Sequence, residues 1–247
     1  MGLKFSIPYQ IPFYETDITH QVKLPHLLAF SLQVSGMQSE SLGNTDKDVF
    51  DKYGLVWIVT DYAIEIDRLP RYNEKVTITT EAISYNKIFC YRNFYITDET
   101  GQQIMLFKTT FALMDYETRK VAEVPDEVVA PYGAEKTKKL LRGPRYKVLE
   151  NPIETLYRVR YFDLDMNGHV NNSKYLEWML DVFNLDFLTK YTPAHIDLKY
   201  VKEIYHGSEI YSGYEFDQEN LSSQHHICVD GNINAQAIIQ WKEIGDE

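Results

Sequence analysis

The sequence predicts an α+β protein that contains one structural unit twice, a helix followed by a run of antiparallel strands. Two observations lead to this prediction. In each half, one helical stripe of apolar residues comes before several long segments rich in β-branched and aromatic residues. In addition, the start of the first half aligns without a gap with residues 148 positions later. Each sheet is expected to wrap around its helix, which buries the apolar faces of both.

The internal repeat is clearest at the start of each half. The aligned pairs are Tyr14 with Phe162, Glu15 with Asp163, Asp17 with Asp165, Ile18 with Met166, Val22 with Val170, and Leu28 with Leu176. At the positions that match Asn167 and His169, the first half has Thr19 and Gln21. We therefore expect one polar site in the chain, located in the second half.

The expected elements follow from local periodicity. In the first half, a helix contains Leu24, Leu27, Leu28 and Leu32, and strands cover residues 56–66, 75–85, 89–97 and 103–114, with turns at 98–101 and 115–118. In the second half, one helix carries the stripe Tyr175, Leu176, Met179, Leu180, Phe183 and Phe187, with Asn171 or Asn172 as its cap and Pro193 beyond its end. Strands are expected at 196–205, 209–216, 225–229 and 235–243.

Composition excludes several classes of protein. The net charge of −11 argues against nucleic-acid binding, which needs a basic face. Two cysteines, Cys90 and Cys228, are too few for a disulfide framework and have no metal-ligand spacing, so neither a metal nor a cofactor is expected. The chain has no secretory signal pattern and no apolar run long enough for a membrane span. A cytoplasmic protein is the expectation.

One segment departs from the acidic average. Lys136, Lys138, Lys139, Arg142, Arg145 and Lys147 follow one another without an intervening acid, and Gly143 and Pro144 interrupt them. This segment predicts a basic linker over residues 134–150, between a first domain at 1–133 and a second at 151–247.

A candidate active site lies at residues 163–172, where an extended segment is expected to lead into the second helix. Asp165, Asn167 and His169 place a carboxylate, an amide and an imidazole at alternate positions, which on an extended backbone project to one side. The start of the helix adds backbone N–H groups and the positive end of its dipole, which a developing oxyanion needs. Taken singly, Asp165 and Asn167 would be turn or cap residues and His169 a partly buried histidine. Their joint spacing favours catalysis.

Two segments resemble the signature motifs of the fatty acyl-ACP thioesterases. Residues 160–180, RYFDLDMNGHVNNSKYLEWML, are similar to the first motif, and residues 198–203, LKYVKE, are similar to the second motif at the family's separation. The resemblance covers nearly the whole chain and implies a tandem double hotdog fold. It also implies hydrolysis of fatty acyl-ACP to free fatty acid and acyl carrier protein (ACP), which terminates fatty acid synthesis. Asp165, Asn167, His169 and Glu203 are carried over as the polar active-site set.

Water is the expected nucleophile. Ile204 stands where the plant members have a cysteine, so a thiol mechanism at that position is excluded. Glu203 is the expected base, oriented through His169 and Asp165, with Asn167 holding the water or the carbonyl, and backbone N–H groups near 168–170 completing the oxyanion hole. Asp165 is a rival base, and the sequence does not rank the two carboxylates. The chain resembles a bacterial relative of the plant enzymes.

Two other functions stay open at this point. A related hotdog enzyme acting on acyl-CoA would use the same polar set, and a non-catalytic acyl-binding module would be consistent with the incomplete set in the first half. The intact set in the second half argues against the last.

The substrate and carrier contacts are assigned by position. Leu28, Leu32 and Trp57 are expected to line the acyl pocket, because the first helix and its facing strand should enclose it. Lys138, Lys139 and Arg142 are expected to dock the acidic carrier protein, although the same segment is equally typical of a solvated linker. Docking near Arg68 and Arg71 is the alternative. The two units in one chain allow a monomer, as an internal pseudodimer, or a homodimer.

Overall fold

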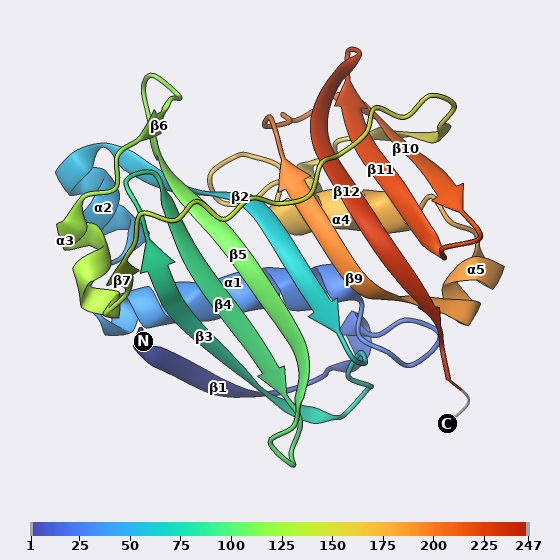
Figure 1. Ribbon diagram of the computed structural model, residues 1–247, viewed down its shortest axis with the longest axis horizontal. Coiled ribbons are helices and arrows are strands. Elements are labelled where there is room, and N and C mark those ends of the chain that lie inside the picture. Colours follow the sequence, from blue (N-terminus) through green and yellow to red (C-terminus); the bar gives the residue numbers. More distant parts are fainter. Residues whose placement is uncertain (1, 246–247) are drawn as a thin grey trace.

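The computed structural model, which describes residues 2–245, contains one continuous 12-stranded sheet (Figure 1). Along the sheet the order is β1 (Lys4–Gln10), β3 (Lys75–Tyr85), β4 (Phe89–Thr97), β5 (Gln103–Asp115), β2 (Leu55–Ile66), β9 (Tyr191–Tyr200), β12 (Asn232–Glu243), β11 (Ser222–Val229), β10 (Glu209–Asp217) and β8 (Ile153–Arg158). Beside this path, β6 (Val121–Ala122) pairs with β5 and β7 (Glu135–Lys136) pairs with β3. All neighbours along the main path are antiparallel.

The two halves meet where β2 pairs with β9. This pairing runs from Asp61 opposite Lys199 to Glu65 opposite His195. At one end of the seam, the Lys242 ammonium donates to the Ile66 carbonyl over 2.8 Å. Because the ladder continues across the boundary, the two halves share one sheet and one large hydrophobic core.

Two helices cover the same face of the sheet, one in each half (Figure 1). In the first half, α1 (Leu24–Ser41) buries Leu24, Leu27 and Leu28 of the predicted apolar stripe, whereas Leu32 is partly buried. In the second half, α4 (Asn172–Leu180) begins at the N-cap Asn171, whose side chain accepts a hydrogen bond from the Ser173 N–H over 3.0 Å. This cap was one of the two alternatives that the sequence allowed.

The second helix is shorter than the periodicity predicts. α4 ends at Leu180, and Phe187 lies in a separate helix, α5 (Leu185–Lys190). The break arises because the Asn184 side chain accepts the Phe187 N–H over 2.9 Å and so starts a new helix. Phe183 and Phe187 still stack at 4.3 Å between ring centroids. The apolar stripe thus still packs against the main core, with Leu180 and Phe187 partly buried, although the backbone of the helix is interrupted.

Strand boundaries agree with the sequence pattern for β3 and β4 and differ most for β9. The predicted strand at 196–205 is wrong at both ends, because β9 starts at Tyr191, includes Pro193 and ends at Tyr200. Pro193 is accommodated beside a register shift between Gln240 and Trp241. The other predicted strands are shorter than the observed ones by one to three residues at an end.

The remaining elements are short. They are α2 (Asp46–Tyr53), α3 (Asp126–Val129), and three 3-10 helices, η1 (Phe13–Glu15), η2 (Ala130–Tyr132) and η3 (Tyr161–Asp163). The α2 helix has a capping box between Thr45 and Asp48 and ends at Gly54 with a φ of 66°. It packs with α3 over a smaller apolar cluster that includes Val49, Leu113 and Val128.

The internal repeat extends to individual hydrogen bonds. The Asp17 N–H donates to the Gln21 carbonyl over 2.9 Å, and the aligned Asp165 N–H donates to the His169 carbonyl over 2.8 Å. The aligned positions His20 and Gly168 are both left-handed, with φ values of 63° and 78°. The two halves therefore share a loop conformation. Its left-handed position is occupied by glycine in the second half, which adopts a positive φ at lower conformational cost than histidine does.

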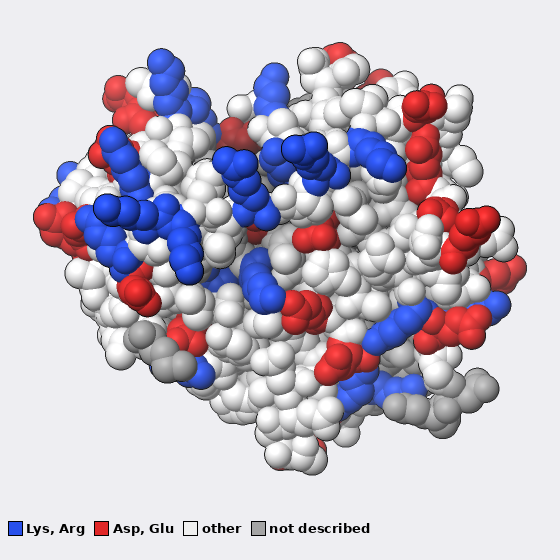
Figure 2. Space-filling view, viewed as in Figure 1, with Lys and Arg blue, Asp and Glu red and all other residues white. Residues whose placement is uncertain are grey.

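The segment between the halves crosses the sheet on the face opposite α1 and α4 (Figure 1). Lys and Arg side chains gather along this path on the same face (Figure 2). Apart from β7, residues 134–150 have no helix or strand. The domain limits at 133 and 151 stay a prediction; residue 1 and residues 246–247, at their outer ends, lie outside the described residues. Within the described chain, no helix is long and apolar enough to cross a membrane.

Candidate active site

The loop that carries Asp165 and His169 is a tight turn, so the predicted extended backbone is wrong. The Asp165 carboxylate accepts the Asn167 N–H over 2.8 Å and the His169 N–H over 3.2 Å. The Gly168 N–H donates to the Asp165 carbonyl over 3.1 Å. Aspartate side chains readily bond their own backbone, and this local bonding closes the turn. Asp165 therefore fixes the conformation of the loop, and two of the N–H groups expected for an oxyanion hole already have acceptors.

Asp163 anchors the start of the loop through hydrogen bonds with Arg160. Its side chain is fully buried and accepts the Arg160 N–H over 2.8 Å and the Arg160 guanidinium over 2.9 Å, with Lys174 Nζ at 3.9 Å. Burial by itself raises the pKa of Asp163, but the hydrogen bonds from Arg160 and the charges of Arg160 and Lys174 outweigh it and hold the pKa below its usual range. The carboxylate is thus ionised at neutral pH and fixes the start of α4.

Glu203 lies in the loop that follows β9, and hydrogen bonds from Asn234 on β12 fix the backbone of this loop. The Asn234 amide donates to the carbonyl oxygens of Lys202 and Glu203, each over 3.3 Å. On the open side, Glu203 Oε2 accepts the Tyr205 hydroxyl over 3.3 Å, and Oε1 lies 3.8 Å from His169 Nε2. The two motifs of the second half, separated in sequence, are therefore brought together by the fold.

Arg119, which no sequence motif indicated, forms an ion pair with Glu203. Arg119 comes from the first half, in the turn between β5 and β6, and has a left-handed φ of 56°. The Asp115 side chain accepts the Thr118 N–H over 2.7 Å and so sets this turn. The sequence predicts the turn but has no signal that it reaches the second half, because the contact depends on the packing of the two units. A guanidinium and a carboxylate thus join the halves at the site.

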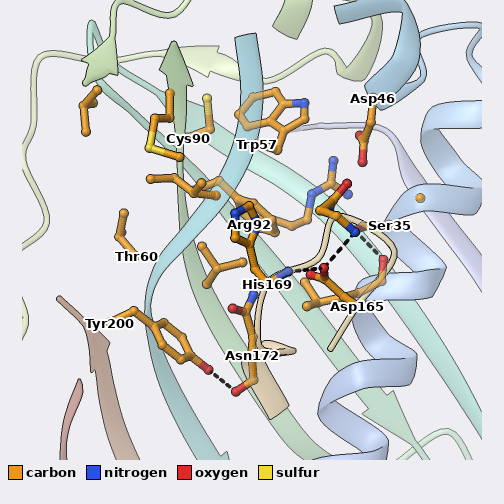
Figure 3. Close-up of a pocket in the computed structure, with 18 of the residues that line it drawn as sticks. Ser35, Asp46, Trp57, Thr60, Cys90, Arg92, Asp165, His169, Asn172 and Tyr200 are labelled. Atoms are coloured by element: carbon orange, nitrogen blue, oxygen red, sulfur yellow. Dashed lines mark hydrogen bonds between the residues drawn. The ribbon is translucent and has the colours of Figure 1, made fainter. Parts of the chain in front are cut away.

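A cavity of about 710 Å³ adjoins the two motifs, and Figure 3 shows Asp165 and His169 in its wall. Asp165, Asn167, His169 and Glu203 all line it, together with Arg119. The His169, Glu203 and Arg119 side chains are 29%, 31% and 32% exposed, so this end of the cavity is open to solvent. The rest of the cavity extends into the first half, between α1 and the sheet.

Two of the three residues expected in the acyl pocket line the cavity. Leu32 and Trp57 line the cavity, as expected, whereas Leu28 does not. Leu28 lies one turn earlier on α1, is 1% exposed, and packs in the main core. Distance along the helix explains the difference, because the cavity follows only the later turns of α1.

The cysteines show no sign of a nucleophile. Cys90 lines the cavity, but burial raises its pKa to about 12, so the thiol stays protonated at neutral pH. Ile204, next to Glu203, is buried in the core at 1% exposure. Among the described residues, no group of three or more His, Cys, Asp and Glu side chains is arranged to hold a metal ion.

Comparison with known proteins agrees with both halves of this description. The family model for the acyl-ACP thioesterase N-terminal domain matches residues 2–132, and the model for the C-terminal domain matches residues 146–243. A palmitoyl-acyl carrier protein thioesterase of Gossypium hirsutum is 25% identical over 97% of this chain and 60% of its own length. An acyl-[acyl-carrier-protein] hydrolase of Cuphea viscosissima is 24% identical over 82% of this chain and 52% of its own length. The chain thus spans little more than half the length of these relatives.

Solved structures give a fuller match. A candidate oleoyl thioesterase from Lactobacillus plantarum superposes with a TM-score of 0.94 at 33% identity, covering 99% of this chain and 98% of the other. A 12:0-ACP thioesterase from Umbellularia californica has a TM-score of 0.86 at 20% identity, with 99% of each chain covered, and shows the fold alone. The predicted α+β double hotdog fold is confirmed. The chain belongs to the acyl-ACP thioesterase family.

Proposed function

We propose that the chain hydrolyses the thioester of fatty acyl-ACP, releasing free fatty acid and the carrier protein. The observation that supports this most is the position of Glu203 Oε1, 3.8 Å from His169 Nε2, at the open end of a cavity of about 710 Å³. A carboxylate and an imidazole at the end of a long cavity suit a substrate whose reactive carbonyl stops there while its chain continues inward. The names of the relatives agree with this reaction.

In the proposed mechanism, Glu203 is the general base. The gap to His169 is too long for a direct hydrogen bond and suits a water that contacts both side chains. Glu203 takes one proton from this water as its oxygen attacks the carbonyl carbon. The carbon–sulfur bond then breaks, and the proton passes to the leaving thiolate. General base catalysis of this kind contributes about 10²–10⁴-fold.

The other polar residues support this step. Asn167 lines the cavity and supplies an amide donor for the carbonyl oxygen, while Asp165 acts as a positioning residue because its carboxylate holds the loop. The Arg119 guanidinium fixes the direction of the Glu203 carboxylate from the other half. Asp165 stays the rival base, since it too borders the cavity.

A direct assay tests the proposed reaction. Purified protein is incubated with matched acyl-ACPs and acyl-CoAs, and free fatty acid is followed over time. The expected result is release from both, with higher kcat/KM for the ACP substrates. Higher kcat/KM for the CoA substrates would assign the protein to the acyl-CoA enzymes, and binding without release of acid would make it an acyl-binding module.

The carrier is proposed to dock on the basic segment at Lys138, Lys139 and Arg142. All three side chains are exposed, and the backbone beneath them is held, because the Asn86 amide donates to the Lys139 carbonyl over 3.0 Å. The Leu141 N–H also donates to the hydroxyl of Tyr91, which lines the cavity, over 3.1 Å. The segment therefore presents a fixed positive surface close to the cavity wall, on a protein of net charge −11.

Reversing these charges tests the docking surface. The variant with Lys138, Lys139 and Arg142 changed to Glu is expected to show a higher KM for acyl-ACP and a weaker dependence on salt, because exposed charges act over about 8 Å at physiological ionic strength. Hydrolysis of a small uncharged thioester should not change. A matched variant with the exposed residues Lys47, Lys52 and Lys190 changed to Glu controls for net charge. Identical acyl-ACP kinetics in both variants would leave the segment as a linker and favour docking near Arg68 and Arg71.

The acyl pocket gives a separate prediction. Trp57→Ala and Leu32→Ala are expected to shift the preferred acyl chain towards greater length, since both side chains occupy the cavity wall. Leu28→Ala is the matched control. It should destabilise the fold by about 2–5 kcal/mol, as buried leucine deletions do, and leave the preference in place. Hydrolysis of short, medium and long acyl thioesters gives the profile, and an unchanged profile in the first two variants would refute the pocket assignment.

We also propose that the protein is cytoplasmic and is either a monomer or a homodimer. Cys90 and Cys228 are both free thiols, in agreement with a reducing compartment.

A further inference from the structure

An arginine that the proposed mechanism does not use lines the cavity. Arg92 on β4 lines the cavity and is only 8% exposed, whereas Glu203 and His169 at the open end are about a third exposed (Figure 3). Burial lowers the pKa of Arg92 to about 10, so the side chain is still charged at neutral pH. A buried cation is unfavourable unless other groups compensate it.

The compensation that the protein supplies is incomplete. One nitrogen, Nη1, donates to Gln38 Oε1 over 2.6 Å and to Thr80 Oγ1 over 2.8 Å, and the guanidinium lies 5.1 Å from the centre of the Tyr132 ring. Within residues 2–245, no carboxylate forms an ion pair with Arg92. Both direct acceptors are neutral, although a guanidinium has five N–H groups to donate. The side chain therefore has donor capacity beyond the acceptors that hold it.

The cavity wall carries further polar groups beside Arg92. On the facing helix, Ser35 and Ser39 line the cavity, and the Ser39 and Tyr132 hydroxyls are hydrogen-bonded to each other over 2.7 Å. Tyr132, whose ring lies beside the guanidinium, lines the cavity as well. A wall for plain hydrocarbon would gain nothing from a guanidinium with unfilled donors, because a buried polar group without a hydrogen-bond partner is unfavourable.

We propose that Arg92 forms a polar subsite in the cavity, which takes an acyl group that carries an oxygen acceptor along its chain, as a hydroxyl, an oxo group or a terminal carboxylate. The subsite rests on the proposed function, since it would contact the acyl chain of that substrate. An acceptor oxygen there completes the hydrogen bonding of the guanidinium. A plain methylene chain does not, and it displaces any water that does.

The test compares saturated acyl thioesters with analogues of equal length that carry one oxygen function at successive carbons. In the wild type, kcat/KM is expected to be higher for the analogue at one position by about tenfold or more, the range for satisfying a buried donor. In Arg92→Met this ratio should fall about tenfold, while hydrolysis of the plain chain is kept or raised. Arg92→Lys should retain part of the ratio. Arg158→Met, at an exposed position on β8, is the control for an arginine-to-methionine change and should keep the wild-type ratio.

Two results would overturn the subsite. One is a wild type with no preference for an oxygen at any carbon, and the other is an Arg92→Met variant whose activity falls equally for plain and oxygenated chains. If Arg92→Met does not fold, the wild type and Arg92→Lys still decide the question. Thermal stabilisation by the matched free fatty acids separates the subsite from the reaction. A preference for the oxygenated acids without any thioester hydrolysis would refute the proposed function and support the subsite.

Discussion

Replacing Glu203 by Gln is expected to lower kcat for acyl-ACP by at least about a hundredfold, the lower range for the loss of a general base. The amide has nearly the same volume, its oxygen can still accept from Arg119, and its NH2 group can donate to the Tyr205 hydroxyl, so the loop should keep its position. What is lost is the ability to take a proton from water. Single-turnover kinetics measure the chemical step, and unfolding in denaturant checks the fold.

The first half provides a matched control for this experiment. Asp17 closes the loop equivalent to the one closed by Asp165, and its carboxylate accepts the Thr19 N–H over 2.8 Å. Asp17→Asn should leave the chemical step nearly unchanged, because the first half lacks the histidine and the amide. If Glu203→Gln keeps near-normal turnover in a folded protein, the base is Asp165.

Asp163→Ala is expected to lower the free energy of unfolding by about 2 kcal/mol at neutral pH and to reduce activity at the same time. The change removes a fully buried carboxylate together with its charged hydrogen bonds from the Arg160 side chain. It also leaves the Arg160 N–H without its acceptor. The energy is moderate because the Arg160 side chain is 67% exposed and can return to water. Urea unfolding gives the stability, and kcat/KM gives the effect on the loop that positions His169.

The effect of Asp163 should depend on pH in a defined direction. Because the folded protein lowers the pKa of this carboxyl, its contribution is present above the unfolded value, about 3.9, and is lost as the pH falls through the lower folded value. The stability difference between wild type and Asp163→Ala should therefore stay constant down to about pH 4 and shrink below it. Asp186→Ala, at an exposed position on α5, is the control. An equal, small effect of both substitutions would contradict the anchoring role.

The pattern of elements was predictable where one local signal dominated. The strands at Lys75–Tyr85 and Phe89–Thr97 have continuous β-branched and aromatic runs, and the structure confirms their bounds. The helix through Phe187 was wrong because periodicity reports burial and not backbone continuity. The Asn184 cap interrupts the helix, while the residues of the apolar stripe still pack in or against the main core.

The site was predictable as a set of residues but not as a geometry. The two motifs indicated Asp165, His169 and Glu203 as one set, and all three line the same cavity, yet the loop is a turn closed by the Asp165 carboxylate and not an extended strand. Arg119 and Arg92 lie in the first half, in a turn and in a strand that look ordinary in sequence. Their roles depend on how the two halves pack together, and no local sequence pattern indicates that packing.

The pairing of β2 with β9 has a consequence for synthesis of the chain. Translation delivers the first half long before residues 191–200, and until β9 arrives the 12-residue β2 is a bare edge of an otherwise formed sheet. Such an edge offers unpaired N–H and C=O groups to any other strand nearby. A nascent or truncated first half is therefore expected to self-associate through β2, until β9 pairs with residues 61–65 and protects that part of the edge.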